Sequence, residues 1–152
     1  MNVAANPALT PIDSAPIDPG MAQFVEKILI ESPVAQKLGV QMRSIEPERV
    51  VLFLPYDATN VTVGEMVHGG VIATLIDIAG AAGSASGADS SKTTRGATTS
   101  LVVNYLNAAN GINLEAEATV IKRGRDMTVT EIAVRGPDGT LIATGTVTSK
   151  LW

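Results

Sequence analysis

The 152-residue chain contains no cysteine and only one histidine, His68. The lack of cysteine excludes disulfides, thiol catalysis and cysteine-ligated metal sites. A single histidine excludes a metal site built from several histidines of one chain, and we expect neither a metal nor an added cofactor. Aromatic residues make up 3% of the sequence. The core must therefore consist mainly of valine, isoleucine, leucine and alanine.

Basic residues are in the minority, with 11 Lys and Arg against 15 Asp and Glu and a net charge of −4. Proteins that bind nucleic acid use a basic surface, so we expect no nucleic-acid partner. Residues 1–20 have neither a basic start nor a continuous apolar run, which argues against a signal peptide. We expect no segment to reach the roughly 20 apolar residues of a membrane span. The sequence therefore predicts a cytoplasmic protein without a membrane partner.

The proline distribution divides the chain unevenly. Four of its eight prolines lie within residues 1–20, and proline interrupts the hydrogen bonds of helices and sheets. We therefore expect residues 1–20 to form an extended or loosely ordered arm. The length and the 45% content of hydrophobic residues predict a single domain for residues 21–152.

Hydrophobic periodicity predicts two helices and six strands. The first helix covers residues 21–31, with Phe24, Val25 and Ile28 on one face, and Ser32-Pro33 ends or interrupts it. The second helix covers residues 70–86, after a loop at 56–67. The expected strands are residues 40–45, 49–55, 98–106, 112–122, 127–135 and 140–151.

Strands that are segregated from the helices in this way are typical of an antiparallel α+β fold. The helix at 70–86 is apolar on nearly all sides and must be enclosed. A curved antiparallel sheet wrapped around one long central helix meets both conditions. The sequence thus predicts the hotdog fold.

One acid interrupts the most apolar stretch of the chain. From Gly69 to Gly83 only Thr74 and Asp77 are polar, and a carboxylate in such surroundings is costly to bury without compensation. The helical neighbours of Asp77, three and four positions away, are all small, so its face of the helix forms a shallow groove. Asp77 therefore serves either a reaction or a structural hydrogen bond at a subunit interface.

His68 is followed by Gly69 and Gly70 at the expected start of this helix. The first amides of a helix are unpaired and lie at the positive end of its dipole, so they can hold a carbonyl oxygen as it becomes an oxyanion. Nine residues separate His68 from Asp77, which places them on opposite sides if both belong to one helix. The alternative is a capping or core histidine, with glycines that only allow a tight entry.

A second candidate site is the turn formed by Lys122, Arg123, Gly124 and Arg125. Its three cations can bind phosphate groups through charge-assisted hydrogen bonds. The alternative is a solvated end of a hairpin with no ligand.

The segment Val67-His68-Gly69-Gly70, the apolar helix with Asp77 and the later strand at 98–106 together resemble the PaaI-like (phenylacetate-pathway type) acyl-CoA thioesterases of the hotdog superfamily. The resemblance extends from about residue 21 to residue 152. It implies a homodimer, often paired into a homotetramer, with each active site between two subunits. Asp77 of one protomer would be the general base or nucleophile.

The resemblance also implies roles for other residues. His68 and the Gly70 amide of the second protomer would receive the thioester carbonyl, and Thr98 falls where relatives carry a hydroxyl residue that helps to place water. Many relatives have asparagine six residues before the histidine, where this chain has Thr62; Asn60 is nearby but would require a shift of the loop.

These observations predict an acyl-CoA thioesterase that releases a free acid and coenzyme A without a metal. The alternatives are an acyl-CoA binder without catalytic activity, to which Thr62 points, and a hotdog hydratase or dehydratase, which also combines a histidine with an acid. A purely structural dimer is a third alternative.

Overall fold

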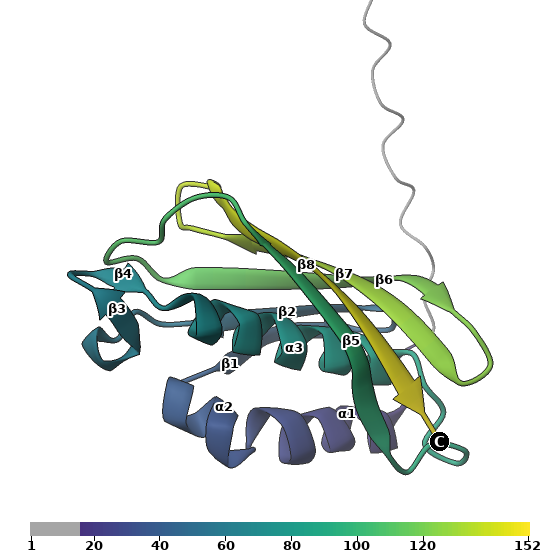
Figure 1. Cartoon of the computed structure of the whole chain (residues 1–152). Coiled ribbons are helices and arrows are strands. Elements are labelled where there is room, and N and C mark those ends of the chain that lie inside the picture. Colours follow the sequence, from purple (N-terminus) through teal and green to yellow (C-terminus); the bar gives the residue numbers. More distant parts are fainter. Residues whose placement is uncertain (1–15) are drawn as a thin grey trace, which may run out of the picture.

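The computed structural model describes residues 16–152 (Figure 1). Its main sheet has six antiparallel strands in the order β1-β2-β6-β7-β8-β5. These strands are β1 (Gln41–Glu46), β2 (Arg49–Leu54), β5 (Gly96–Tyr105), β6 (Leu114–Arg123), β7 (Met127–Arg135) and β8 (Leu141–Leu151). The sheet curves over the long helix α3 (Gly69–Ser86). The closest contacts of α3 with the sheet are with β2, β5, β6, β7 and β8. The predicted hotdog fold is confirmed.

Buried and exposed side chains alternate along β6, and this alternation shows which face of the sheet packs against α3. Leu114, Ala116 and Ala118 are fully buried on the side of α3, whereas Glu115 and Glu117 lie on the opposite face. Successive side chains of a strand point to opposite faces of a sheet. The inner face is therefore apolar and the outer face is polar, as the sequence predicts.

The backbone of α3 lies unusually close to β8, and two glycines make this approach possible. A Cβ atom on Gly80 would lie 2.5 Å from Cβ of Val147, and a Cβ atom on Gly145 would collide with the side chain of Ile76. Val147 and Ile76 are fully buried. The absence of a side chain at Gly80 and at Gly145 therefore allows α3 to lie close to β8.

We expect Gly80→Ala to lower the free energy of unfolding. Alanine is more favourable than glycine inside a helix by about 1 kcal/mol. Overpacking of a filled core costs about 1–3 kcal/mol, and the branched Val147 side chain has little freedom to move. Urea unfolding measures the difference. Gly83→Ala is the matched control, because its Cβ would meet Thr130 Cγ2 at 3.2 Å and should be tolerated better; a stabilised Gly80→Ala variant would contradict this account.

The N-terminal helices pack on the side of α3 that the sheet leaves open (Figure 1). They are α1 (Pro19–Phe24), the π-helical turn η1 (Val25–Ile30) and α2 (Pro33–Leu38). Asp18 caps α1 by accepting hydrogen bonds from the amides of Gly20 and Met21 at 2.8 and 3.1 Å. Ser32-Pro33 interrupts the helical segment, as predicted, and starts α2.

The expected apolar face of this segment is wrong in part. Val25 is buried, but Phe24 is only partly buried and Ile28 is 56% exposed, and the other buried residues are Met21 and Ile30. The cause is the π-helical turn, whose wider winding brings residues five positions apart, Val25 and Ile30, onto one face.

The helix also begins at Pro19, two residues before the expected start, because proline suits the first position of a helix. Residues 1–15 of the expected N-terminal arm lie outside the described part of the chain.

The expected loop at 56–67 contains a short 3-10 turn, η2 (Ala58–Asn60), and a small two-stranded sheet of β3 (Val61–Val63) and β4 (Met66–Val67).

The expectation that no segment resembles a membrane span is wrong for α3. By length and composition alone, this 18-residue helix is long and apolar enough to cross a membrane. Most of α3 is buried inside the domain. It is therefore the core helix of this fold.

Candidate active site

Asp77 lies on α3 and lines a largely apolar pocket. Its Oδ1 atom accepts a hydrogen bond from Thr98 Oγ1 of β5 at 2.7 Å. Among residues 16–152 no Lys, Arg or His forms an ion pair with it. The pocket has a volume of about 190 Å³ and is lined mainly by residues of η1, α3, β5 and β8. A half-buried carboxylate held by one hydroxyl can act as a base or as a nucleophile.

The helix entrance is built around His68, the N-cap of α3. Its Nδ1 atom accepts a hydrogen bond from the Gly70 amide at 2.8 Å. An imidazole that accepts through Nδ1 is neutral there and carries its proton on Nε2. His68 therefore caps α3, which is one of the alternatives that the sequence allows. The Nε2–H group of this exposed side chain stays available as a donor.

Tyr105 is a residue of the helix entrance that the sequence analysis did not assign to the site. Its hydroxyl donates a hydrogen bond to the Gly69 carbonyl at 2.7 Å. A Cβ atom on Gly69 would lie 3.3 Å from the Tyr105 ring, and one on Gly70 would lie 3.0 Å from His68 Nδ1. A side chain at either glycine would thus crowd Tyr105 or His68. Tyr105 lies 36 residues from Gly69 along the chain, so no local pattern links the two.

Within one protomer the acid and the histidine do not meet. Nine residues of helix correspond to roughly 13 Å between them along the axis. The helix entrance borders a separate hollow of about 370 Å³, which is lined by Gly69 and Tyr105 and shares no residue with the Asp77 pocket.

Thr62 and Asn60, the two candidates for the counterpart of the family asparagine, lie in different surroundings. Thr62 lines the hollow at the helix entrance together with Gly69. Asn60 is buried, and its side-chain amide donates to the Leu38 carbonyl at 3.4 Å while its backbone carbonyl accepts from the His68 amide at 2.8 Å. Thr62 is therefore the residue at the entrance, and Asn60 supports the loop behind it.

The three cations of the turn at 122–125 are not equivalent. Arg123 binds both carboxylate oxygens of Glu48, at 2.7 and 3.2 Å, and donates to the Ser84 carbonyl of α3 at 2.7 Å and to Thr128 Oγ1 at 3.3 Å. These contacts tie the turn to the end of the central helix and give Arg123 a structural role. The side chains of Lys122 and Arg125 are exposed, and the Gly124 amide closes the turn on the Met127 carbonyl at 2.7 Å.

We expect Arg123→Met to lower the free energy of unfolding by about 1–3 kcal/mol, because hydrogen bonds to charged groups contribute this much. Denaturant unfolding measures it. Lys122→Met and Arg125→Met are matched controls in the same turn and should stay within about 0.5 kcal/mol of the parent, as is usual for surface substitutions. Equal losses for all three variants would contradict the distinction.

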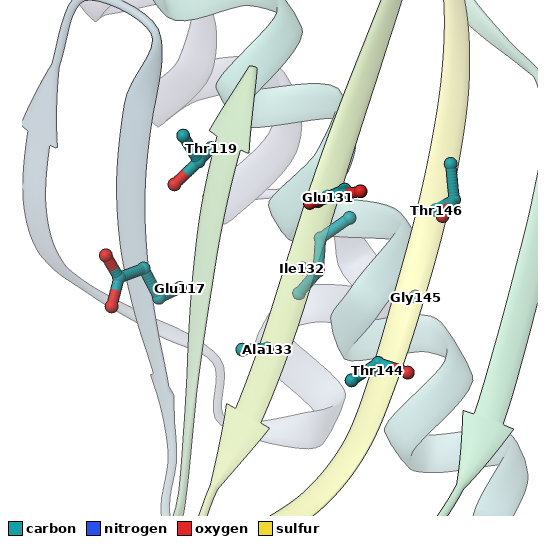
Figure 2. A pocket seen from close by; sticks show the side chains of 8 residues that line it. All are labelled: Glu117, Thr119, Glu131, Ile132, Ala133, Thr144, Gly145 and Thr146. Carbon is teal, nitrogen blue, oxygen red and sulfur yellow. The ribbon is translucent and has the colours of Figure 1, made fainter. Parts of the chain in front are cut away.

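A further hollow lies elsewhere, on the outer face of the sheet (Figure 2). It measures about 490 Å³ and is bordered by β6, β7 and β8. Its charged side chains are Glu117 and Glu131, of which Glu117 pairs with Arg49 at 2.8 Å. None of the predicted site residues lies there, and its acidic lining does not suit an anionic ligand.

Residues 64–143, more than half of the chain, match the family model described as the thioesterase superfamily. The chain belongs to this superfamily. A protein of Halobacterium salinarum named "Putative esterase" is 34% identical over 122 residues, which cover 78% of this chain and 80% of that relative.

Solved structures share the fold. A thioesterase family protein from Silicibacter pomeroyi is 30% identical, with a TM-score of 0.79 over 86% of this chain and 97% of its own. The E. coli PaaI protein from the phenylacetic acid degradation operon is 19% identical, with a TM-score of 0.77 over 88% of this chain and 94% of its own. The resemblance to PaaI-like hotdog thioesterases is therefore confirmed.

Proposed function

We propose that this protein is an acyl-CoA thioesterase in which Asp77 is the general base or nucleophile. The observation that carries the proposal is the Asp77–Thr98 pair in the lining of a largely apolar pocket, in a chain of the thioesterase superfamily. Asp77 either removes a proton from the attacking water or attacks the thioester carbonyl carbon itself. In the first case the hydroxide adds to the carbonyl carbon, the carbon–sulfur bond breaks, and the leaving thiolate takes up the proton that Asp77 removed from the water. In the second case the thiolate leaves as a mixed anhydride forms on Asp77, and a water molecule then hydrolyses this anhydride and regenerates the carboxylate. Both routes give a free acid and the thiol of coenzyme A.

In this proposal His68 holds the carbonyl oxygen of the substrate. The Gly70 amide, which was also predicted to bind this oxygen, already donates to His68 Nδ1. It therefore fixes the imidazole with its proton on Nε2, and Nε2–H becomes the donor to the developing oxyanion. Gly69 contributes by admitting the Tyr105 ring that anchors the entrance.

The acid and the histidine of one site come from two protomers of a homodimer. β5 is a ten-residue edge strand with exposed apolar side chains at Leu101 and Val102, and such an edge is a template for pairing with another strand. Its two ends carry Thr98 and Tyr105, which contact Asp77 and Gly69 respectively. A two-fold axis through the middle of β5 would bring the Thr98 end of one strand beside the Tyr105 end of the other.

The phosphate groups of coenzyme A are assigned to the turn at 122–125. Arg125 lines a cavity of about 410 Å³, together with Lys92 of the loop after α3. This cavity shares Leu151 with the Asp77 pocket, so a thioester at Asp77 lies on the same side of the domain as these cations. Lys92 and Arg125, which line this cavity, would bind phosphate, and Arg123 would hold the turn in place. Lys122, the remaining predicted cation, does not line it.

A thiol-release screen over short, long, branched and aryl acyl-CoA substrates tests the proposal. We expect release from at least one class. Binding of acyl-CoA in a calorimeter without any thiol release would instead support a non-catalytic binder, the alternative that Thr62 suggests. Loss of enoyl absorbance without thiol release would identify a hydratase or dehydratase.

A further inference from the structure

The pocket beside Asp77 has a polar end and an apolar end, and this division suggests how a substrate would lie in it. Asp77 and Thr98 form the polar end. Beyond them the pocket is lined by two alanines of α3, by Leu151 and by three side chains of the N-terminal helices, namely Phe24, Ile28 and Leu29. Ligand pockets are typically apolar with a few polar groups that fix orientation. The thioester belongs at the polar end and the acyl group beyond it.

The alanines give the direction of the pocket along α3. Asp77, Ala81 and Ala85 are spaced by four residues, so they share one face of the helix and follow one another toward its C-terminal end. The N-terminal segment runs the other way. Asp18, which caps α1, accepts a hydrogen bond from the Ser90 amide at 3.2 Å, just beyond the end of α3. From there the chain runs back, so Phe24 covers the far end of the pocket and Leu29 lies nearer to Asp77.

The π-helical turn explains why these side chains are available to the pocket. It places Val25 and Ile30 in the core, and Phe24, Ile28 and Leu29 then face the space between the N-terminal helices and β5. In Figure 1 the start of β5 lies close to α1 beside α3. The wall of the pocket is therefore formed by the helices that precede the thioesterase-family match, which begins at residue 64.

We infer that Phe24 closes the far end of the acyl pocket and limits this thioesterase to short or single-ring acyl groups. The inference rests on the proposed function. The volume of about 190 Å³ is close to that of an apolar cavity of about 150 Å³ that accepts benzene, and it is too small for a long acyl chain.

The test compares hexanoyl-CoA, benzoyl-CoA, decanoyl-CoA and hexadecanoyl-CoA by thiol release. The parent protein should prefer hexanoyl-CoA or benzoyl-CoA. Phe24→Ala should raise the kcat/KM of decanoyl-CoA relative to hexanoyl-CoA by at least about tenfold, the scale on which an apolar pocket discriminates between chain lengths. Glu26→Ala, an exposed residue of the same segment, should leave the ratio unchanged. Phe24→Leu is a milder variant in case Phe24→Ala fails to fold.

Three outcomes separate the inference from the proposed function. A parent protein that prefers hexadecanoyl-CoA, or a folded Phe24→Ala variant with an unchanged ratio, overturns the inference and leaves the thioesterase proposal intact. If no acyl-CoA is hydrolysed, the proposed function fails. Non-hydrolysable acyl-CoA thioethers of the same chain lengths then test the pocket by calorimetry, and the inference stands only if Phe24→Ala improves the binding of the decanoyl analogue over the hexanoyl one.

Discussion

Asp77→Asn should lower the kcat of thioester hydrolysis by about 10²-fold or more, in the range expected for the loss of a general base. The amide cannot take up the proton of an attacking water and is not a nucleophile. Its oxygen can still accept the hydrogen bond that Thr98 donates at 2.7 Å in the parent protein, and its size is nearly the same. The variant should therefore fold and bind substrate normally. Thiol release under saturating substrate measures the loss.

Two controls make the Asp77 experiment specific. Glu115→Gln makes the same change from carboxylate to amide on the outer face of the sheet, and it should leave kcat unchanged. Thr98→Val removes the hydroxyl that holds the carboxylate but keeps the shape of the side chain, and it should cost less than Asp77→Asn. Near-normal turnover of Asp77→Asn would remove Asp77 from the mechanism and leave it the structural role that the sequence also allows.

The central helix and the strands could be predicted from sequence because their signals are local. The run from residue 69 to residue 86 is too apolar for any position except the centre of the domain, and the alternation around Leu114, Ala116 and Ala118 marks one buried face. Each pattern lies within one continuous stretch of at most 18 residues. The strand at 127–135 has the expected bounds in the structure, and the others differ by up to two residues at their ends.

The features that the sequence did not predict depend on contacts between residues far apart in the chain, which no local pattern reveals. The π-helical turn at Val25–Ile30 changes which side chains are buried, and it packs against α3, which is distant in the sequence. Arg123 was grouped with its exposed neighbours because its partner Glu48 lies 75 residues away in the sequence. The bond from Tyr105 to Gly69 crosses between β5 and α3. In each case the deciding contact is tertiary.

Co-expression of an Asp77→Asn chain with a His68→Asn chain should restore activity that neither variant has alone. His68→Asn is chosen because asparagine is a good N-cap, so the start of α3 keeps its cap while the imidazole donor is lost. Removal of such a donor costs about 10²–10³-fold in kcat in other enzymes. Two affinity tags isolate the mixed dimer, and light scattering establishes that it is a dimer.

The mixed dimer distinguishes the two possible arrangements of the site. If Asp77 of one protomer works with His68 of the other, one of its two sites has both residues intact, and turnover per dimer should be about half that of the parent. If both residues served a site within one protomer, every site would carry a defect and turnover would stay at the level of the single variants. The roughly 13 Å of helix between the two residues and their separate pockets argue for the first arrangement. A mixed dimer without restored activity would show that the acid and the histidine do not share a site across β5.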